Sequence, residues 1–370
     1  MDTETNLENV LKKEGLIKIA IDMHLKNYRV VRQIDHSNPQ PAQKFEPVAF
    51  YGWLEKQRAL AARVVVCYEA GCFGYEPARR MRAMGVEVYV IAPQNWDEQG
   101  KRQVNDKHDA QVMCRRLSEY LDGHGKALSM VRIPSREEEA RRAVGRMREQ
   151  LRRELRRIQA MGRSLLLQAE VAVTGRWWKG RSWVRISEAI PPWMVAPLES
   201  WKEVIELLEK QALAIEGQLK ATAPVPELLF GEGELTHELL GRELIDPHRF
   251  KNARQVGNYF GLCPSESTSD ERRRLGSITK HGNPRLRRLM VELAWRISRF
   301  QPRYRAVRRW GAVLEDPKAC AAARKKAIVA LARRLAVDLW RMATGRVQAE
   351  ELGFVRKVNV GWLERELLCH

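Results

Sequence analysis

The stretch RVVVCYEAGCFGYEPARRMRAMGVEVYVI, residues 63–91, decides the fold class of the first part of the chain. It opens with a β-branched run, continues through a segment at 76–84 that reads as a helix, and closes with a second β-branched run at 86–91. Pro77 suits a first helical turn, and Gly85 suits a helix end. Two strands joined by a short helical crossover form a βαβ unit, whose strands are parallel. The sequence therefore predicts an α/β domain.

The flanking residues extend this domain. IKIAID at 17–22 and YRVVRQI at 28–34 are two further β-branched runs a few residues apart, which is the pattern of a hairpin. Beyond the last strand, apolar residues recur at helical spacing over 106–121. We expect a sheet that is partly antiparallel and partly parallel.

The rest of the chain reads as helical. Arg- and Glu-rich segments at 136–169 and 199–220 have apolar residues at helical spacing, so we expect an antiparallel helical arm. Its helices pack within one monomer or against a second copy. Between them lies an irregular tip with Pro191 and Pro192, whose tryptophans either are buried anchors or stack on bases: Trp177, Trp178, Trp183 and Trp193.

Charge and composition narrow the class of partner. The net charge of +19 and pI of about 9.9 favour a polyanion such as DNA, RNA or an anionic membrane. No stretch approaches the roughly 20 apolar residues of a membrane span, and the polar N-terminus does not read as a secretory signal. The six cysteines show no zinc-binding spacing, so we expect free thiols in a reducing cytosol.

Four acidic residues follow predicted strands or begin a helix. Asp22 ends the first strand, Glu69 follows the third, and Asp106 and Asp109 share one face at the start of the helix at 106–121. Taken singly, each acid is usually a turn or cap residue. As a set they favour Mg²⁺ or Mn²⁺, which prefer oxygen ligands, and two such ions assist phosphate cleavage. His24 and His108 flank the acids and either orient a ligand or face solvent.

The insert GLCPSESTSDERRRLGSITKHGN, residues 261–283, interrupts the C-terminal helices. Its glycines and Pro264 predict turns, and its serines offer hydroxyl nucleophiles. The alternative is a polar loop whose serines cap the next helix. Basic residues in and after the insert could contact phosphate: Arg272, Arg273, Arg274, Lys280, Arg285, Arg287 and Arg288.

These segments together resemble a known family. IAIDMHLKNY, VVVCYEAG and VNDKHDAQ resemble, in this order, the three acidic blocks of the DEDD transposases of bacterial insertion sequences, the insertion sequence 110 family. FKNARQVGNYFGLCPSESTSDERRRLGSITKHGNPRLRRLMVELAW resembles that family's C-terminal transposase block, and GEGELTHEL at 231–239 loosely resembles a helix-hairpin-helix-like stretch upstream of it. The region with the acidic blocks and the region with the serines lie about 150 residues apart, on either side of the helical segments.

The resemblance assigns roles to particular residues. It places the family's metal-binding acids on Asp22, Glu69, Asp106 and Asp109, and its nucleophile, the second serine of an S-S-G motif, on Ser269. Here the chain departs from the motif: Thr268 replaces the first serine and Asp270 the glycine, which leaves Ser267 as the reserve.

The resemblance also implies an activity and an architecture. The activity is bridge-RNA-guided recombination through a serine–DNA intermediate assisted by Mg²⁺, with donor and target DNA as substrates, in a bacterial cytoplasm at the nucleoid. The assembly is a homodimer or tetramer in which one site combines parts of different protomers. The expected divisions are an N-terminal arm at 1–16, a RuvC-like (RNase H-like) α/β domain at 17–125, the helical arm at 126–222, a mainly helical transposase domain at 223–345, and a C-terminal tail at 346–370.

Two alternatives stay open at this point. A RuvC-like, metal-dependent nuclease that uses water needs the four acids but no serine. A non-enzymatic nucleic-acid-binding protein needs neither, because its acids only cap helices and form ion pairs.

Overall fold

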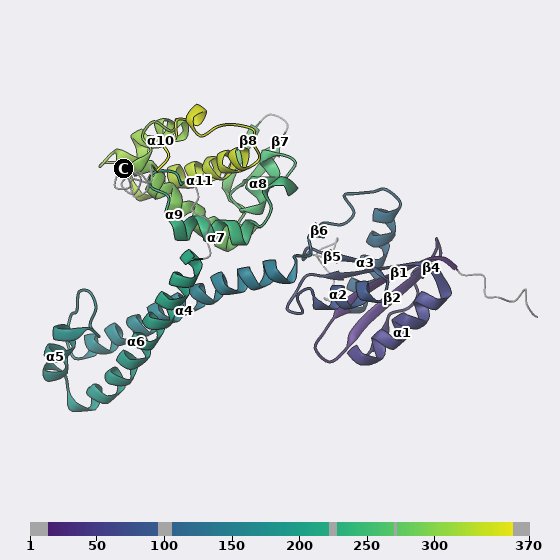
Figure 1. Ribbon diagram of the computed structural model, residues 1–370, viewed down its shortest axis with the longest axis horizontal. Helices are drawn as coiled ribbons and strands as arrows, with labels where there is room; N and C mark the ends of the chain where they lie inside the picture. The colour runs from purple at the N-terminus through teal and green to yellow at the C-terminus, as the bar shows by residue number, and fades with distance from the viewer. Residues whose placement is uncertain (1–13, 95–105, 222–227, 270–271, 358–370) are drawn as a thin grey trace, which may run out of the picture. The chain divides into compact units, whose positions relative to one another are not determined.

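The computed structural model describes residues 14–94, 106–221, 228–269 and 272–357. The chain divides into two compact units, Met1–Ser135 and Arg136–His370. Figure 1 labels their elements in sequence order: the described part of the first unit holds a sheet and three helices, and the second unit is mainly helical.

A six-stranded mixed sheet forms the centre of the first unit. Its order is β3-β2-β1-β4-β5-β6, with β1 antiparallel to β2 and parallel to β4, and β4 parallel to β5. The predicted hairpin and the predicted βαβ unit are both confirmed by these pairings. The elements are β1 (Glu14–Met23), β2 (Tyr28–Ile34), β3 (Gln43–Phe45), α1 (Pro47–Leu60), β4 (Ala61–Glu69), α2 (Glu76–Ala83), β5 (Glu87–Ile91), α3 (Asp106–Leu121) and β6 (Met130–Val131).

Helices cover both faces of this sheet. Successive side chains along a strand point to opposite faces, so Ile19 and Ile21 of β1 pack with α1 and α2, whereas Ala20 packs with α3. The same alternation along β4 sends Val66 and Tyr68 to the first face and Val65 and Cys67 to the second. The face of the sheet that α3 covers therefore carries Ala20 and Cys67, together with the residues an even number of positions away from them on β1 and β4.

Two long helices open the second unit. α4 (Arg136–Gln168) and α6 (Pro192–Ala221) pack antiparallel: Arg148 in the first half of α4 pairs with Glu216 near the end of α6 at 2.8 Å, while Leu166 near the end of α4 clusters with Met194 near the start of α6. Figure 1 shows the pair as a hairpin with α5 (Gly180–Ala189) at its turn. The second helix starts at Pro192, earlier than the predicted 199, because proline is well suited to a first helical turn.

The tryptophans between these helices divide into two groups. Trp177 and Trp178 are buried, as the anchor interpretation requires, and the Trp177 indole donates to the Gln159 carbonyl at 3.1 Å. Trp193, in contrast, is 63% exposed. The buried pair belongs to the core that joins α4, α5 and α6.

A helical body completes the second unit around one apolar core. Phe354 stacks on Tyr304, and Val347 and Leu352 are buried in the same core, so the residues after 345 pack into the body at least as far as Phe354. The elements are α7 (Glu234–Leu244), η1 (Pro247–Arg249), α8 (Ala253–Tyr259), β7 (Pro264–Ser269), β8 (Arg272–Ile278), α9 (Pro284–Phe300), α10 (Arg305–Glu315), α11 (Ala321–Ala343) and η2 (Glu350–Leu352).

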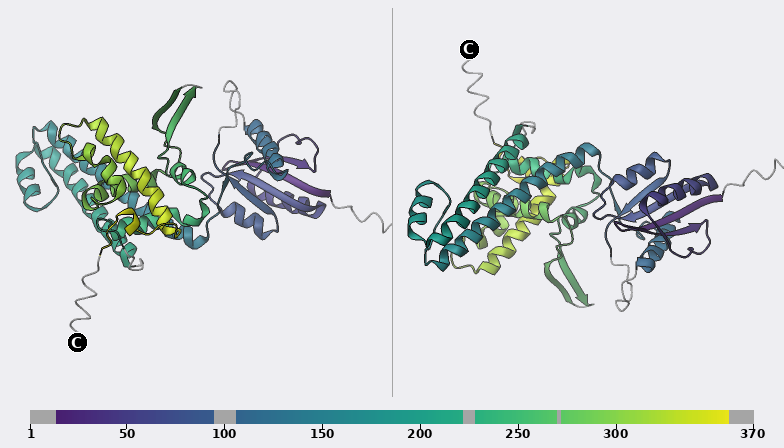
Figure 2. Two further views of the ribbon diagram at one scale, coloured as in Figure 1. Left: turned by 90° about the horizontal axis from the view of Figure 1, so that it is seen from above. Right: turned by 90° about the horizontal axis from the view of Figure 1, so that it is seen from below.

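The insert at 261–283 differs from the turn-rich loop that its sequence predicts. β7 and β8 pair antiparallel in a two-stranded sheet, from Pro264 opposite Ile278 to Ser269 opposite Arg272. Figure 2 shows this hairpin projecting from the helical body. Its polar strands lack the apolar alternation that marks a half-buried strand, which is why the sequence does not reveal them.

Two expectations from composition can be compared with the described residues. Within them, no helix is long and apolar enough to cross a membrane. Five cysteines, namely Cys67, Cys72, Cys114, Cys263 and Cys320, are free thiols, and Cys369 lies outside the described residues.

Candidate active site

Two of the four predicted acids lie side by side at the carboxyl ends of neighbouring strands. Along the parallel β1–β4 pair, Ile21 is in register with Tyr68, and the next residue on each strand is Asp22 or Glu69. Neighbouring strands are about 4.8 Å apart. Alternation from Ala20 and Cys67 directs both carboxylates to the α3 face of the sheet.

Both acids are partly exposed and make contacts within the protein. Asp22 is 24% exposed, and its Oδ2 lies 3.1 Å from Nε2 of His24, whose own side chain is 45% exposed. Glu69 Oε1 accepts a hydrogen bond from the backbone N–H of Gln94 at 3.2 Å. Partial exposure leaves the carboxylates reachable from solvent, as a metal or substrate site requires.

α3 runs antiparallel to β1 along this face. Near its end, Ser118 Oγ accepts from the buried Lys18 ammonium at 2.7 Å. One turn earlier, Cys114 lies against Ala20: burial raises the pKa of its thiol to about 12, and the Lys18 charge and a hydrogen bond with the Ala20 backbone act against that rise. Four helical residues advance about 6 Å and two strand residues about 6.6 Å.

The next turn back along α3 therefore lies level with Asp22. That turn contains Ala110, which is fully buried in the same cluster as Ala20, and its neighbour Asp109, which is partly exposed. Asp109 thus comes from the helix to the sheet edge where Asp22 and Glu69 lie. Asp106 is the first residue of α3, and its side chain lies outside the described residues.

The described side chains do not by themselves form a metal centre. Among them, no group of three or more His, Cys, Asp or Glu side chains is positioned to hold a metal ion. The four-carboxylate set includes Asp106, so the metal site remains a prediction.

The predicted nucleophile lies at the end of β7. Ser269 is the last residue of that strand and is opposite Arg272, while Ser267 is opposite Arg274. The side chains of 267–269 and 272–275 lie outside the described residues.

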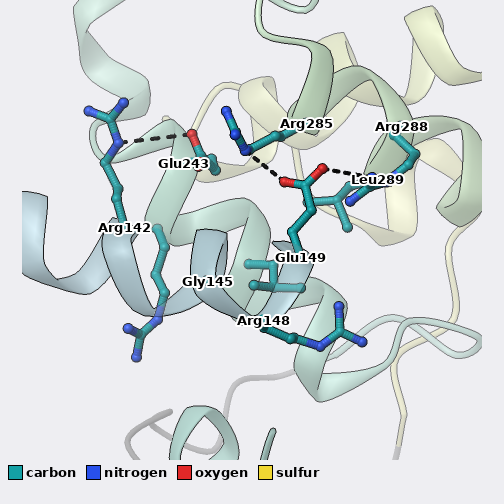
Figure 3. A pocket seen from close by; sticks show the side chains of 10 residues that line it. Arg142, Gly145, Arg148, Glu149, Glu243, Arg285, Arg288 and Leu289 are labelled. Carbon is teal, nitrogen blue, oxygen red and sulfur yellow. Dashed lines mark hydrogen bonds and ion pairs between the residues drawn. The ribbon is translucent and has the colours of Figure 1, made fainter. Parts of the chain in front are cut away.

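Several of the predicted phosphate contacts are engaged within the protein. Glu149 of α4 pairs with Arg285 at 2.7 Å and with Arg288 at 2.8 Å, so it ties α4 to the start of α9 (Figure 3). Arg287 donates to the backbone carbonyl of Lys280 at 3.1 Å. Lys280 itself is exposed.

Glu243 of α7, beside Glu149, also binds side chains from other parts of the second unit. Burial opposes its ionisation, but hydrogen bonds from Arg146 and Asn283 outweigh burial and lower the pKa of the Glu243 carboxyl. The sequence reveals neither Glu149 nor Glu243 as a partner, because each lies far along the chain from the groups it binds. The cluster joins α4 to α7 and α9 of the helical body (Figure 3).

Comparison with known proteins first gives the class. Residues 229–308, which run from before α7 into α10 and include the serine-bearing hairpin, match the family described as Transposase IS116/IS110/IS902 family. This part of the chain is that of a transposase.

Relatives extend the match to most of the chain. The Sinorhizobium fredii protein y4rJ, named as a transposase, is 30% identical over 324 residues, which is 80% of this chain and 81% of the relative. The Yersinia enterocolitica transposase for insertion sequence element IS1328 is 25% identical over 284 residues, 75% of this chain and 82% of the relative. The chain therefore belongs to the IS116/IS110/IS902 family of transposases. Transposases cleave DNA and transfer its strands, so the expectation of an enzyme is confirmed.

Proposed function

We propose that this transposase cuts and rejoins the DNA of an insertion sequence through a covalent intermediate on Ser269, assisted by Mg²⁺ held by Asp22, Glu69, Asp106 and Asp109. The observation that carries the proposal is the register that pairs Ile21 with Tyr68, since it brings two of the acids together on the α3 face of the sheet. The DNA substrate follows from the family and from relatives named for insertion sequence elements.

The serine chemistry is a transesterification. The Ser269 hydroxyl attacks a backbone phosphorus, so that an Oγ–P bond forms as the bond from phosphorus to one sugar oxygen breaks. The serine proton is lost, and the departing sugar oxygen becomes a hydroxyl. Attack by a second sugar hydroxyl reverses the step and joins new strands. Arg272 and Arg274, which lie opposite Ser269 and Ser267 in the register of the hairpin, would offset the phosphate charge.

The donor set fits a hard divalent cation. Asp22, Glu69 and Asp109 offer carboxylate oxygens from two strand ends and one helix start, and Asp106 adds a fourth at that helix start. When bound, Mg²⁺ would supply Lewis-acid stabilisation of charge on phosphate. His24 would hold Asp22 in position through its 3.1 Å contact. This mixed sheet with acids at its edge supports the RuvC-like assignment of the first unit.

RNA guidance and assembly are further parts of the proposal. The net charge of +19 supports binding of both DNA and a bridge RNA. The antiparallel pair α4–α6 provides a long helical surface through which two or four copies would associate, so that carboxylates and serine come from different protomers.

A strand-exchange assay with matched serine variants tests the proposal. The reaction contains donor and target DNA, RNA transcribed from the element's flank, and Mg²⁺. Ser269→Ala should abolish exchange and keep nucleic-acid binding, because it removes a hydroxyl and no charge. Ser298→Ala of α9 is the matched control: it also loses one hydroxyl, which donates to the Trp295 carbonyl at 2.9 Å, and should remain active.

Other results would contradict parts of the proposal. Full activity of Ser269→Ala with loss in Ser267→Ala would move the nucleophile two residues along the strand. Strand exchange at the normal rate without RNA would contradict guidance by RNA. DNA cleavage by both Ser269→Ala and Ser267→Ala would favour a nuclease that uses water.

A further inference from the structure

A large groove in the second unit lies beside the hairpin that carries Ser269. It has a volume of about 1380 Å³ and is lined by α8, the base of the β7–β8 hairpin, α10 and α11. These elements lie together in Figure 1, where α8 and α11 flank the start of the hairpin. The groove reaches Ser265 and Glu266 of β7, and Ser269 is four residues beyond Ser265, about 13 Å along the strand.

The charge of the groove is strongly positive. Its lining includes Arg254 of α8 and Lys325, Lys326 and Arg333 of α11, all exposed and without an ion-pair partner among the described residues. A further lining arginine, Arg334, is held by Asp338 at 2.7 Å and is left out of this set. The lining contains one acid, Glu266. A cleft lined by unpaired cations concentrates anions, and phosphate is the anion that the proposed substrates carry.

The arrangement on α11 adds a second feature. Lys326 and Arg333 are seven residues apart and therefore lie on one helix face, with Val329, Ala330 and Val337 on the same side. Charge thus alternates with small apolar side chains along one wall. Trp310 of α10, which is partly buried, also lines the groove, and the Arg309 guanidinium lies 5.3 Å from the centre of its ring.

We propose that this groove binds a single-stranded segment of nucleic acid, with phosphates on Lys325, Lys326, Arg333 and Arg254 and with bases against Trp310 and the apolar wall. Unpaired bases expose faces that stack on aromatic and apolar side chains, whereas a duplex buries them. The proposal rests on the proposed function for the presence of nucleic acid, but it does not depend on the serine chemistry. The groove would lead an unpaired strand of DNA or RNA toward the hairpin.

A binding experiment with matched charge variants tests this groove. The full-length protein is titrated with fluorescein-labelled oligonucleotides of one sequence as single-stranded DNA, single-stranded RNA and duplex DNA, at several salt concentrations. The groove variant combines Lys326→Ala and Arg333→Ala. The control combines Lys210→Ala and Lys220→Ala, which remove the same charge from exposed positions of α6.

The groove variant should bind single strands about tenfold more weakly than the control at 0.1 M salt. The slope of log K against log salt should flatten by about 1.4, since each phosphate contact on a single strand contributes about 0.7. Duplex binding should change less. A single strand that carries 5-iodouracil should crosslink to the peptide that contains Trp310. A stronger effect on single-stranded RNA than on DNA would identify RNA as the natural occupant, and the reverse would identify DNA.

Equal binding by the groove and control variants would overturn the proposal, as would a crosslink confined to another part of the chain. A loss equal for duplex and single strands would overturn the single-strand assignment. Failure of the serine mechanism has a different signature: Ser269→Ala would then still exchange strands, whatever the groove variants bind.

Discussion

Replacing Gly162 by alanine should destabilise the end of the α4–α6 pair. Gly162 lies in α4 where the Trp177 ring crosses the helix, and a Cβ atom there would overlap three carbons of that ring. The ring has no free space to move, because it is fully buried, contacts Trp178 and Trp183, and donates to the Gln159 carbonyl.

The expected cost follows from these contacts. Overpacking a buried site costs about 2 kcal/mol, and disturbing the indole hydrogen bond costs about 1 kcal/mol. Alanine regains about 1 kcal/mol through its better helix propensity. A net loss of about 2 kcal/mol should lower the Tm of a unit of this size by about 6 °C.

Calorimetry with a matched glycine variant checks this estimate. Gly217 is a helical glycine of α6 with no atom near its would-be Cβ, so Gly217→Ala should leave Tm unchanged or raise it slightly. Near-UV circular dichroism should show a changed tryptophan signal for Gly162→Ala alone. If Gly162→Ala were as stable as Gly217→Ala but bound nucleic acid less well, the buried-anchor account of Trp177 would be refuted.

Three further predictions concern the site and its supports. Asp22→Asn should reduce Mg²⁺-dependent strand exchange at least about 100-fold by weakening metal coordination, whereas Asp35→Asn, just after β2 and hydrogen-bonded to the backbone N–H of Leu16, should not; equal rates in a metal titration would refute this role. His237→Gln should remove a pH dependence of stability. The hydrogen bond to Glu232 raises the pKa of His237 above 6.5, so its contribution is present below pH 6.5 and is lost as pH rises through the raised value; identical Tm–pH curves would contradict it. Glu149→Gln should lower Tm by about 3 °C by removing the partner of two arginines, and an unchanged Tm would count against that contact.

Much of the first unit can be predicted from the sequence because its strands are buried. β-branched runs such as 63–68 favour strands, and a helical crossover between 68 and 86 favours a parallel pair. The helix at 47–60 is not among the predicted elements, although Phe50 and Leu54 are buried in the sheet core. The hydrophobic residues of this helix pack against the sheet, and that tertiary contact cannot be recognised from the sequence of the helix alone.

Elements that depend on distant partners are harder to predict. The β7–β8 hairpin is polar and projects from the body, so no burial pattern marks it. Phe354 reads as part of a tail, yet it stacks on Tyr304 some fifty residues earlier. Such contacts are set by tertiary packing, which periodicity does not record.

Part of the candidate site can likewise be predicted from the sequence, and part of it cannot. The sequence predicts that Asp22 and Glu69 each follow a strand, but the parallel pairing of β1 with β4 that brings them side by side is a finding of the structure. The pairing of Arg285 and Arg288 with Glu149 cannot be expected, since the residues are over 130 positions apart. An arginine that follows a serine-rich insert looks the same in sequence whether it binds phosphate or a carboxylate.

Trapping the covalent intermediate tests the central claim most directly. The protein is mixed with Mg²⁺, RNA from the element's flank and labelled donor and target DNA, and is then denatured, separated by electrophoresis and digested for mass spectrometry. We predict a labelled protein–DNA band whose adduct maps to Ser269 and which is absent from Ser269→Ala. Cleaved DNA without any adduct, or an adduct that persists in Ser269→Ala, would contradict the account.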